Sequence, residues 1–399
     1  MSNKSIWSLP FVILIVTNFL ENMSLQMLTA TLPLYVRFLG GTPTAIGVVA
    51  GAFAVSALAV RPFAGPAFDS FSRKWMLFGA LALMVIATAL YAVVTSVNAL
   101  ILIRLLHGIG LGIAGPLGLT LAADTLPSDK VSSGVSVYML AQAISQAIGP
   151  ALGIWLAEVI WFKWLFIFCS FVFGLSTLVL AFLKDPTKAP RQPYRLSLGR
   201  MFAKQAIIPA IILFYLYLAY SCQFAFVVIY GHLRGVNQIG LYFTVYSLCL
   251  LLTRPIFGRL SDRYGTTRVI LPAFLCFGLS YWLLSFSTSL PAFLLASVIA
   301  ACGLGVCTPL MQALMMQLLP RQMRTIGSNT TYTGMDFGML FGPILGGAII
   351  ENRMGVLATE ADAYGSMFAF MIIPVAIACI VYMLGYRRMK ADKLQNENT

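Results

Sequence analysis

The chain has 399 residues, of which 59% are apolar and only 10% are charged, and its mean hydropathy is +0.88. Soluble domains carry about a quarter charged residues, so this composition excludes a soluble globular protein and indicates a chain that crosses a lipid bilayer. The formal net charge of +13 does not indicate nucleic-acid binding, because the basic residues lie in short segments between apolar runs and not on one soluble face.

Apolar runs of membrane-spanning length follow one another along the sequence. A helix needs about 20 residues to cross a bilayer, and each run is close to that length or longer. The runs cover 7–32, 44–65, 75–96, 98–122, 132–157, 162–183, 205–230, 238–258, 269–287, 290–318, 326–350 and 364–386. The sequence therefore predicts an all-α membrane protein of twelve transmembrane helices, with one six-helix bundle in residues 1–183 and another in residues 205–386.

Polar segments separate and follow the two predicted bundles. Residues 184–204 contain three prolines and six basic residues, which predicts a linker, and residues 387–399 are predicted to form a tail. We count 21 of the 26 Lys and Arg on the membrane side that holds both termini and the linker. Because cytoplasmic loops retain basic residues, we predict a cell-membrane protein with both termini in the cytoplasm.

One sequence pattern occurs twice, 193 positions apart. Residues 61–69 read RPFAGPAFD and residues 254–262 read RPIFGRLSD. The same offset aligns two further groups of residues, namely Gly110, Gly112 and Pro116 with Gly303, Gly305 and Pro309, and Gly149, Pro150 and Gly153 with Gly342, Pro343 and Gly346. A repeat of about half the chain predicts two halves with the same fold.

These patterns resemble those of the major facilitator superfamily. The repeated segments are similar to the family's loop motif, and the matching residues are Gly65, Asp69 and Arg73 in the first copy and Gly258, Asp262, Arg263 and Arg268 in the second. Residues 104–112 (RLLHGIGLG) resemble an Arg-x-x-Gln-Gly-x-Gly element, with His107 in place of glutamine. Residues 145–153 (SQAIGPALG) resemble the Gly-Pro element of proton-driven exporters, with Ser145 and Ile154 in place of its first and last glycines. The resemblance implies a two-bundle transporter that works by alternating access.

The two loop-motif aspartates, Asp69 and Asp262, are predicted at the cytoplasmic ends of helices. A carboxylate there can pair with an arginine or with a helix N-terminus in one conformation and separate from it in another. The resemblance implies that these residues gate the cytoplasmic side. The alternative is that they only fix topology and loop geometry.

Glycine and proline mark two further features of the predicted helices. Gly149-Pro150 and Gly342-Pro343 are predicted kinks, because proline removes a backbone donor. A face for close helix packing is predicted in the fourth run, at Gly108, Gly110, Gly112, Gly115 and Gly118. The kinks either serve packing alone or let the helices rock between two states.

Three ionised residues, Glu21, Arg104 and Asp336, lie well inside apolar runs. Each costs about 2.5–3.5 kcal/mol near a helix centre, so each is expected to face a cavity or a partner. At about 1.5 Å per residue, Glu21 lies roughly 13 Å and Arg104 roughly 9 Å from the outer surface, so the two can meet. Glu21 and Asp336 are the proton-coupling candidates; the alternatives are a permanent ion pair for Glu21 and a hydroxyl partner for Asp336.

His107 lies one helical turn from Arg104. It is a third proton-carrying candidate, and the alternative is that it replaces glutamine as a neutral hydrogen-bonding group. Substrate-binding candidates are the amides, aromatic residues and polar stripes of the first, fourth, fifth, seventh and eleventh runs: Asn18, Asn22, Gln26, Arg104, Gln142, Gln146, Tyr217, Tyr220, Gln223, Phe224, Asn329 and Thr333. Aromatic walls with a few amides suit an amphipathic substrate.

The sequence thus predicts a proton-coupled antiporter, a monomer in the bilayer, that exports a small amphipathic drug or metabolite. Alternatives are proton-coupled uptake of an organic anion or sugar, flipping of a glycolipid, and a non-transporting receptor. No enzyme, cofactor or metal is expected, because catalytic motifs are lacking and the seven cysteines lie singly in apolar runs.

Overall fold

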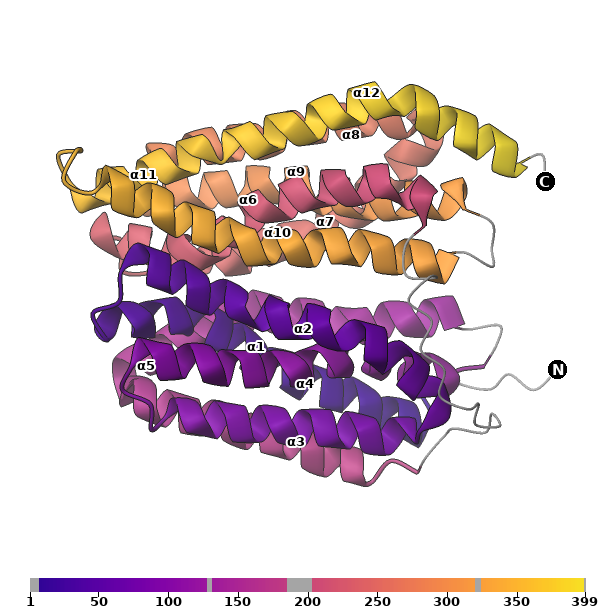
Figure 1. Ribbon diagram of the computed structural model, residues 1–399, viewed down its shortest axis with the longest axis horizontal. Helices are drawn as coiled ribbons and strands as arrows, with labels where there is room; N and C mark the ends of the chain where they lie inside the picture. The colour runs from indigo at the N-terminus through magenta and orange to yellow at the C-terminus, as the bar shows by residue number, and fades with distance from the viewer. Residues whose placement is uncertain (1–6, 128–130, 185–202, 320–323, 398–399) are drawn as a thin grey trace. The chain divides into compact units, whose positions relative to one another are not determined.

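The computed structural model describes residues 7–127, 131–184, 203–319 and 324–397. Most of the predicted linker, residues 185–202, therefore lies outside the described residues. The first half contains α1 (Leu9–Phe38), α2 (Pro43–Ser70), α3 (Arg73–Tyr91), α4 (Val97–Asp124) and α5 (Val131–Ala181). The second contains α6 (Ile207–Leu233), α7 (Leu241–Tyr264), α8 (Thr266–Ser285), α9 (Leu290–Leu318), α10 (Arg324–Arg353), α11 (Glu360–Phe370) and α12 (Ile372–Glu397), preceded by a 3-10 turn at Lys204–Ala206 (Figure 1).

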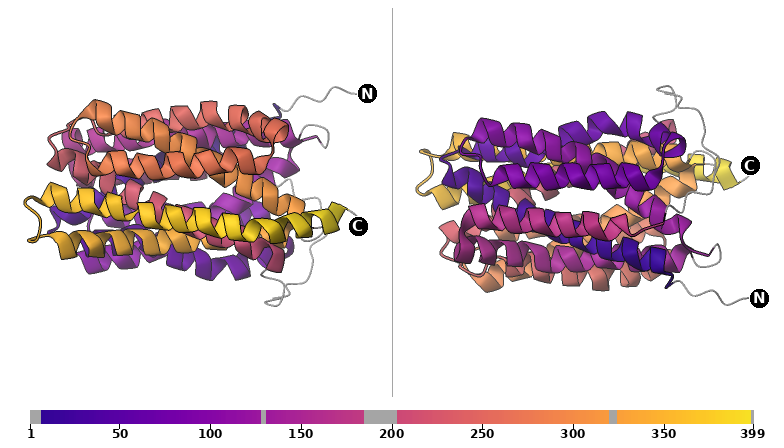
Figure 2. Two further views of the ribbon diagram at one scale, coloured as in Figure 1. Left: turned by 90° about the horizontal axis from the view of Figure 1, so that it is seen from above. Right: turned by 90° about the horizontal axis from the view of Figure 1, so that it is seen from below.

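The all-helical prediction is confirmed, since the described ranges contain α-helices and no strand. Within them, ten helices are long and apolar enough to cross a membrane, and Leu241–Thr253 is a shorter apolar helix. Within each unit the helices lie side by side with their axes roughly aligned (Figures 1 and 2).

Several helix limits differ from the predicted runs, and three of the differences concern a turn or a proline. α5 covers the fifth and sixth runs, and the chain turns between them at Trp161, whose φ of 70° and ψ of 155° are not helical. The twelfth run is divided into α11 and α12, because Pro374 cannot donate to a carbonyl four residues earlier, at Phe370, where α11 ends. α1 continues through Pro33 to Phe38, since neighbouring helices make an internal proline tolerable.

The chain forms two compact units. Unit 1 contains Met1–Tyr35 and Ala52–Leu196, and unit 2 contains Val36–Gly51 and Ser197–Thr399. The division between Leu196 and Ser197 falls in the predicted linker. The segment Val36–Gly51, which comprises the end of α1 and the start of α2, groups with the second half of the chain.

The sequence repeat has a counterpart in helix packing within each unit. A Cβ built on Gly110 would lie 2.5 Å from Met84 in unit 1, and one built on Gly303 would lie 2.5 Å from Phe277 in unit 2. The offset of 193 relates both members of these pairs. The predicted duplication therefore extends to the contacts that the glycines make.

α10 packs against α6 through a row of glycines at every fourth position. These glycines are Gly334, Gly338, Gly342 and Gly346. A Cβ on Gly338 would lie 2.5 Å from the Phe214 carbonyl oxygen, and one on Gly342 would overlap the Leu218 carbonyl. Only glycine permits this approach of two helix backbones. In unit 1, Gly149 and Gly153 of α5 meet α1 in the same way. The helices continue past both Gly-Pro pairs, so the predicted kinks stay a prediction.

A second face of α10 meets the start of α2, and both segments belong to unit 2. A Cβ on Gly51 would lie 2.6 Å from the Leu340 carbonyl oxygen, and one on Gly47 would overlap the Pro343 carbonyl. Arg37, at the end of α1, forms an ion pair with Glu360 of α11 at 3.0 Å. Segments from the two sequence halves thus meet through backbone contacts and a half-exposed ion pair.

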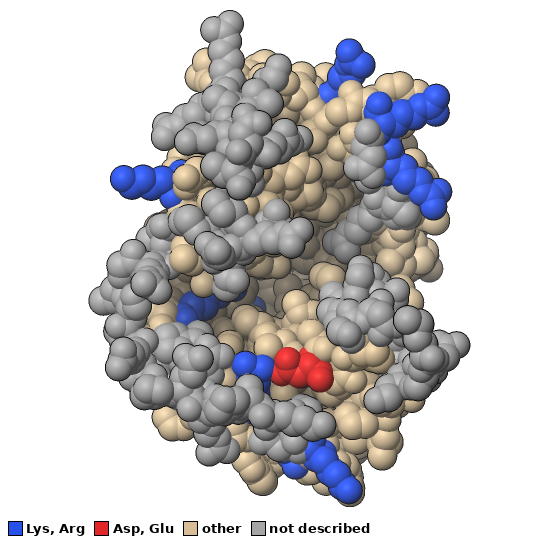
Figure 3. Space-filling model, turned by 90° about the vertical axis from the view of Figure 1, so that its right-hand side faces the viewer, with Lys and Arg blue, Asp and Glu red and all other residues tan. Residues whose placement is uncertain are grey.

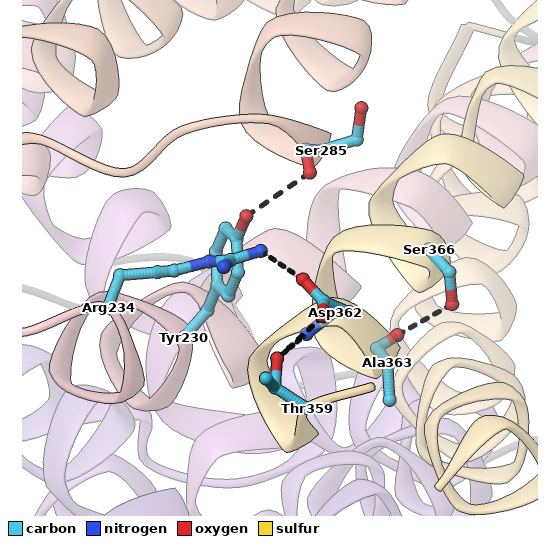
Figure 4. Close-up of polar contacts among 7 residues, drawn as sticks. All are labelled: Tyr230, Arg234, Ser285, Thr359, Asp362, Ala363 and Ser366. Carbon is cyan, nitrogen blue, oxygen red and sulfur yellow. Dashed lines mark hydrogen bonds and ion pairs between the residues drawn. The ribbon is translucent and has the colours of Figure 1, made fainter. Parts of the chain in front are cut away.

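Polar contacts fix the ends of α6, α8 and α11 in unit 2 (Figure 4). The Arg234 guanidinium lies over the Tyr230 ring at 5.4 Å and donates to Asp362 at 2.8 Å. The Tyr230 hydroxyl donates to the Ser285 carbonyl at 3.2 Å. Thr359 caps α11 by accepting from the Asp362 backbone N–H at 3.1 Å.

Removing this cap is expected to destabilise the protein modestly. Thr359→Ala deletes the oxygen that satisfies a free N–H at the start of α11, which costs about 1 kcal/mol. The thermal unfolding midpoint of the purified protein measures the loss. Thr359→Ser retains the hydroxyl and is the control; an unchanged midpoint in Thr359→Ala contradicts the capping role.

Candidate functional site

The polar stripe predicted on α1 is buried in unit 1. Asn18, Glu21 and Asn22 are each less than a tenth exposed. The Asn22 side-chain amide donates to Asn18 Oδ1 at 2.9 Å, and the Asn18 amide donates to the Tyr138 carbonyl of α5 at 2.9 Å. Nearby, the Ser145 hydroxyl donates to the Phe19 carbonyl at 3.0 Å. The first half of α5 therefore supplies the surface against which the α1 stripe packs.

Glu21 is the buried carboxyl group of this stripe, with 5% of its surface exposed. Among the described residues it takes part in no ion pair, and Tyr138 is a neighbour within electrostatic range. Gln26 packs beside Gly149 on the same side of α1. Gln142 is exposed and Gln146 is half-buried on α5.

Arg104 of α4 is in a different environment from Glu21. Its guanidinium lies over the Phe53 ring of α2 at 4.8 Å, and it acts electrostatically on Tyr91 and His107. No ion pair joins Arg104 to Glu21 in the described parts of unit 1. The rise per residue predicts how deep each residue lies in the membrane. It does not predict which neighbouring helix each side chain faces.

His107 lies fully buried between α3 and the second half of α5. Its Nδ1 is 3.2 Å from the Tyr91 hydroxyl, and its ring meets the Phe173 ring edge-on at 5.8 Å. If Tyr91 donates, the imidazole proton is on Nε2, for which no described atom is a partner. Next to this region, α4 packs on α2 through Gly108 and Gly112, two residues of the predicted glycine face. At Gly115, a third residue of that face, no described atom lies within 4 Å of a built Cβ.

Aromatic residues of α6 and α7 form a cluster in unit 2. The ring centroids of Tyr217 and Tyr220 are 5.4 Å apart, and those of Tyr220 and Phe224 are 4.6 Å apart. Two rings of α7 join them. The ring centroid of Phe243 is 4.9 Å from that of Phe224, and the ring centroid of Tyr246 is 6.3 Å from that of Tyr220. The sequence analysis missed these two residues, although their spacing of three places them on one helix face. The fold thus brings together five rings, of which three were predicted and two were not.

Gln223 lies apart from the exposed side of this cluster. Its side chain is fully buried, and neither amide atom has a hydrogen-bond partner in the described part of unit 2. Its role as a substrate ligand stays a prediction.

The polar stripe of α10 lies on the same side of the helix as the residues that contact α2. Asn329, Thr333 and Asp336 continue at helical spacing into Leu340 and Pro343, whose carbonyls meet α2. Asn329 is exposed, and Thr333 and Asp336 are half-buried. The Thr333 hydroxyl donates to the Asn329 carbonyl at 2.8 Å. Asp336 therefore lies one turn from the residues that pack against α2.

Gly65 and Asp69 lie in the last turns of α2, and Gly258 and Asp262 lie in the last turns of α7. The surroundings of these four residues lie outside what the structure describes. Arg73 donates to the Phe68 carbonyl at 3.0 Å and pairs with Asp124 at the end of α4. Arg263 and Arg268 are exposed. Among the described residues drawn in Figure 3, Lys and Arg side chains are seen at several places and acidic surface at one. The gating role stays a prediction.

Comparison with known proteins agrees with this architecture. Residues 14–237 and 209–399 match the model of the Major Facilitator Superfamily. The chain is 24% identical to the multi-drug resistance efflux pump PmrA of Streptococcus pneumoniae, over 93% of this chain and 94% of that protein. It is 26% identical to the quinolone resistance protein NorA of Staphylococcus aureus, over 99% of this chain and 100% of that protein.

A solved structure gives the same result for the fold. A bacterial homolog to the human lysosomal transporter Spinster matches with a TM-score of 0.82 at 14% identity, over 98% of this chain and 99% of that one. The family match extends over nearly the whole sequence and agrees with the repeated two-bundle fold. The chain therefore belongs to the major facilitator superfamily and is a multi-pass membrane transporter.

Proposed function

We propose that the chain exports small amphipathic compounds in exchange for protons, by alternating access in the cell membrane. The observation that carries the proposal is the burial of Glu21 in α1 without an ion pair among the described residues. A carboxylate loses several kcal/mol of hydration when it leaves water. A carboxyl group in this position can therefore take up or release its proton as its access to water changes.

The direction and the substrate class rest on two further observations. The aromatic cluster of α6 and α7, with Tyr217 and Tyr220 half-buried, offers apolar surface with hydroxyl groups, which suits an amphipathic compound. The relatives PmrA and NorA carry the names of an efflux pump and of a drug-resistance protein. Both support export of a drug-like compound.

Replacing Glu21 by glutamine is expected to abolish proton-driven transport. The amide keeps the size of the side chain but cannot release a proton. Proteoliposomes with an imposed pH gradient and 1-pyrenebutyrate, an amphipathic fluorescent carboxylate, as the transported dye measure the effect. We expect accumulation against the dye gradient to fall by about tenfold or more, which corresponds to about 1.4 kcal/mol of lost coupling. Glu158→Gln removes an exposed carboxylate of α5 and serves as the control.

Other outcomes distinguish the competing functions. Accumulation at the wild-type rate in Glu21→Gln contradicts the proton role of Glu21, and a loss confined to Asp336→Asn transfers that role to α10. Accumulation under the opposite pH gradient indicates uptake by symport.

A further inference from the structure

A compact group of side chains in unit 1 surrounds the buried guanidinium of Arg104. We call it the Arg104 cluster, and it consists of Phe53 of α2, Tyr91 of α3, and Arg104 and His107 of α4. The approach of α4 to α2 creates it, because a Cβ on Gly108 would overlap the Phe53 carbonyl. Arg104 keeps 3% of its surface exposed, His107 and Tyr91 keep none, and Phe53 is half-buried.

The packing leaves hydrogen-bond donors of this cluster unused. The Phe53 ring covers one face of the guanidinium at 4.8 Å, and the Tyr91 hydroxyl is a hydrogen-bonding neighbour of the same group. Arg104 Nε and His107 Nε2 are both buried and have no hydrogen-bond partner among the described residues. The Tyr91 hydroxyl is 3.2 Å from His107 Nδ1. If Tyr91 donates to Nδ1, the imidazole proton is on Nε2, and this N–H is a second type of donor in the cluster.

The described acidic side chains of unit 1 do not neutralise Arg104. Glu21 lies near Tyr138, Asp124 pairs with Arg73, and Glu158 is exposed on α5. An uncompensated charge inside a membrane protein is costly, which favours a negative group that approaches from outside the chain. A planar guanidinium with its edge available binds the two oxygens of an oxyanion through parallel hydrogen bonds.

We propose that the Arg104 cluster binds the oxyanion group of the transported compound, so that the preferred substrates are amphipathic molecules with a carboxylate or a phosphate. Arg104 supplies the charge and the paired donors, and His107 supplies an additional N–H. This inference rests on the proposed transport function only for the identity of the ligand. It requires neither a proton gradient nor a particular direction of transport.

The test uses two probes that share an aromatic body, 2-naphthylacetate and the neutral 2-naphthaleneethanol. Isothermal titration calorimetry on the purified full-length protein is expected to show at least about tenfold tighter binding of the carboxylate, as one charge-assisted pair of hydrogen bonds provides. Arg104→Gln is expected to abolish that preference. Arg104→Lys keeps the charge without the paired donors, and we expect it to retain only part of the preference. Lys163→Gln removes an exposed charge of the same unit and should change nothing.

Each contrary result overturns a defined part of the inference. Equal binding of both probes by the wild type, or an unchanged preference in Arg104→Gln, overturns the assignment of the site. If Arg104→Gln does not fold, an unchanged preference in Arg104→Lys overturns the paired-donor geometry. Acetate or inorganic phosphate that binds as tightly as 2-naphthylacetate, and only with Arg104 present, overturns the assignment to a substrate in favour of a free ion. The binding assay uses no pH gradient, so its results do not depend on the outcome of the Glu21 transport experiment.

Discussion

Leucine in place of Gly342 is expected to prevent most of the protein from folding. A side chain at this position would overlap the Leu218 carbonyl and the Ser221 hydroxyl of α6, and the backbone carbonyl cannot move without displacing a buried helix. Overpacking of this kind costs about 3 kcal/mol or more. The monodisperse fraction in size-exclusion chromatography and the thermal unfolding midpoint both measure the loss.

Gly174→Leu is the matched control for this experiment. Gly174 also lies inside a long apolar helix, but no described atom is within 4 Å of a Cβ built there. We expect Gly174→Leu to fold like the wild type. Equal yields and midpoints for both variants would show that the glycine row of α10 does not determine how closely α10 and α6 pack.

Leucine in place of Gly47 is expected to reduce transport strongly while the protein still folds. Gly47 meets the Pro343 carbonyl, and Gly51 meets the Leu340 carbonyl, so a larger side chain disfavours the contact between α2 and α10. Alternating access requires such a contact to form in one state and to open in another. The added side chain costs about 3 kcal/mol, as at Gly342, but only in the state in which the contact is formed, so the population of that state falls about 150-fold.

Dye transport in proteoliposomes and the unfolding midpoint separate this effect from simple destabilisation. A conformational effect lowers transport with little change in the midpoint, whereas a folding defect lowers both. Gly79→Leu is the control, since no described atom is within 4 Å of a Cβ on Gly79. Transport by Gly47→Leu at the wild-type rate would contradict a role for this contact in the transport cycle.

Much of the fold could be predicted because the chain repeats its own packing residues. The offset of 193 relates Gly112 and Ala57 to Gly305 and Leu250, which are in contact in unit 2 as the first pair is in unit 1. Hydropathy located the apolar runs but not their exact limits. The non-helical conformation of Trp161 was not detected, because nothing in the side-chain chemistry of a tryptophan indicates a positive φ.

The arrangement of the candidate site was harder to predict. Residue counts placed Glu21 and Arg104 at similar depths, but the pairing of helices decides that Glu21 faces α5 and Arg104 faces α2 and α3. The α6 aromatic residues were predicted because several of them occur close together in the sequence. Phe243 and Tyr246 were overlooked because Tyr242, Thr244 and Ser247 lie among them, so that polar and aromatic residues do not mark one face of α7. Depth follows from the chain itself, and contacts across helices depend on the packing of the whole unit.

The glycine contacts of α10 also bear on how fast the helix can move. Backbone surfaces without side chains do not interlock, so α10 can slide along its neighbours without a rotamer having to change. Polar contacts between other helices of the unit, such as the Arg37–Glu360 pair that joins α1 to α11, then contribute to the activation barrier for such a movement. Because half-exposed ion pairs are screened by ions, the rate of the conformational change should rise with ionic strength.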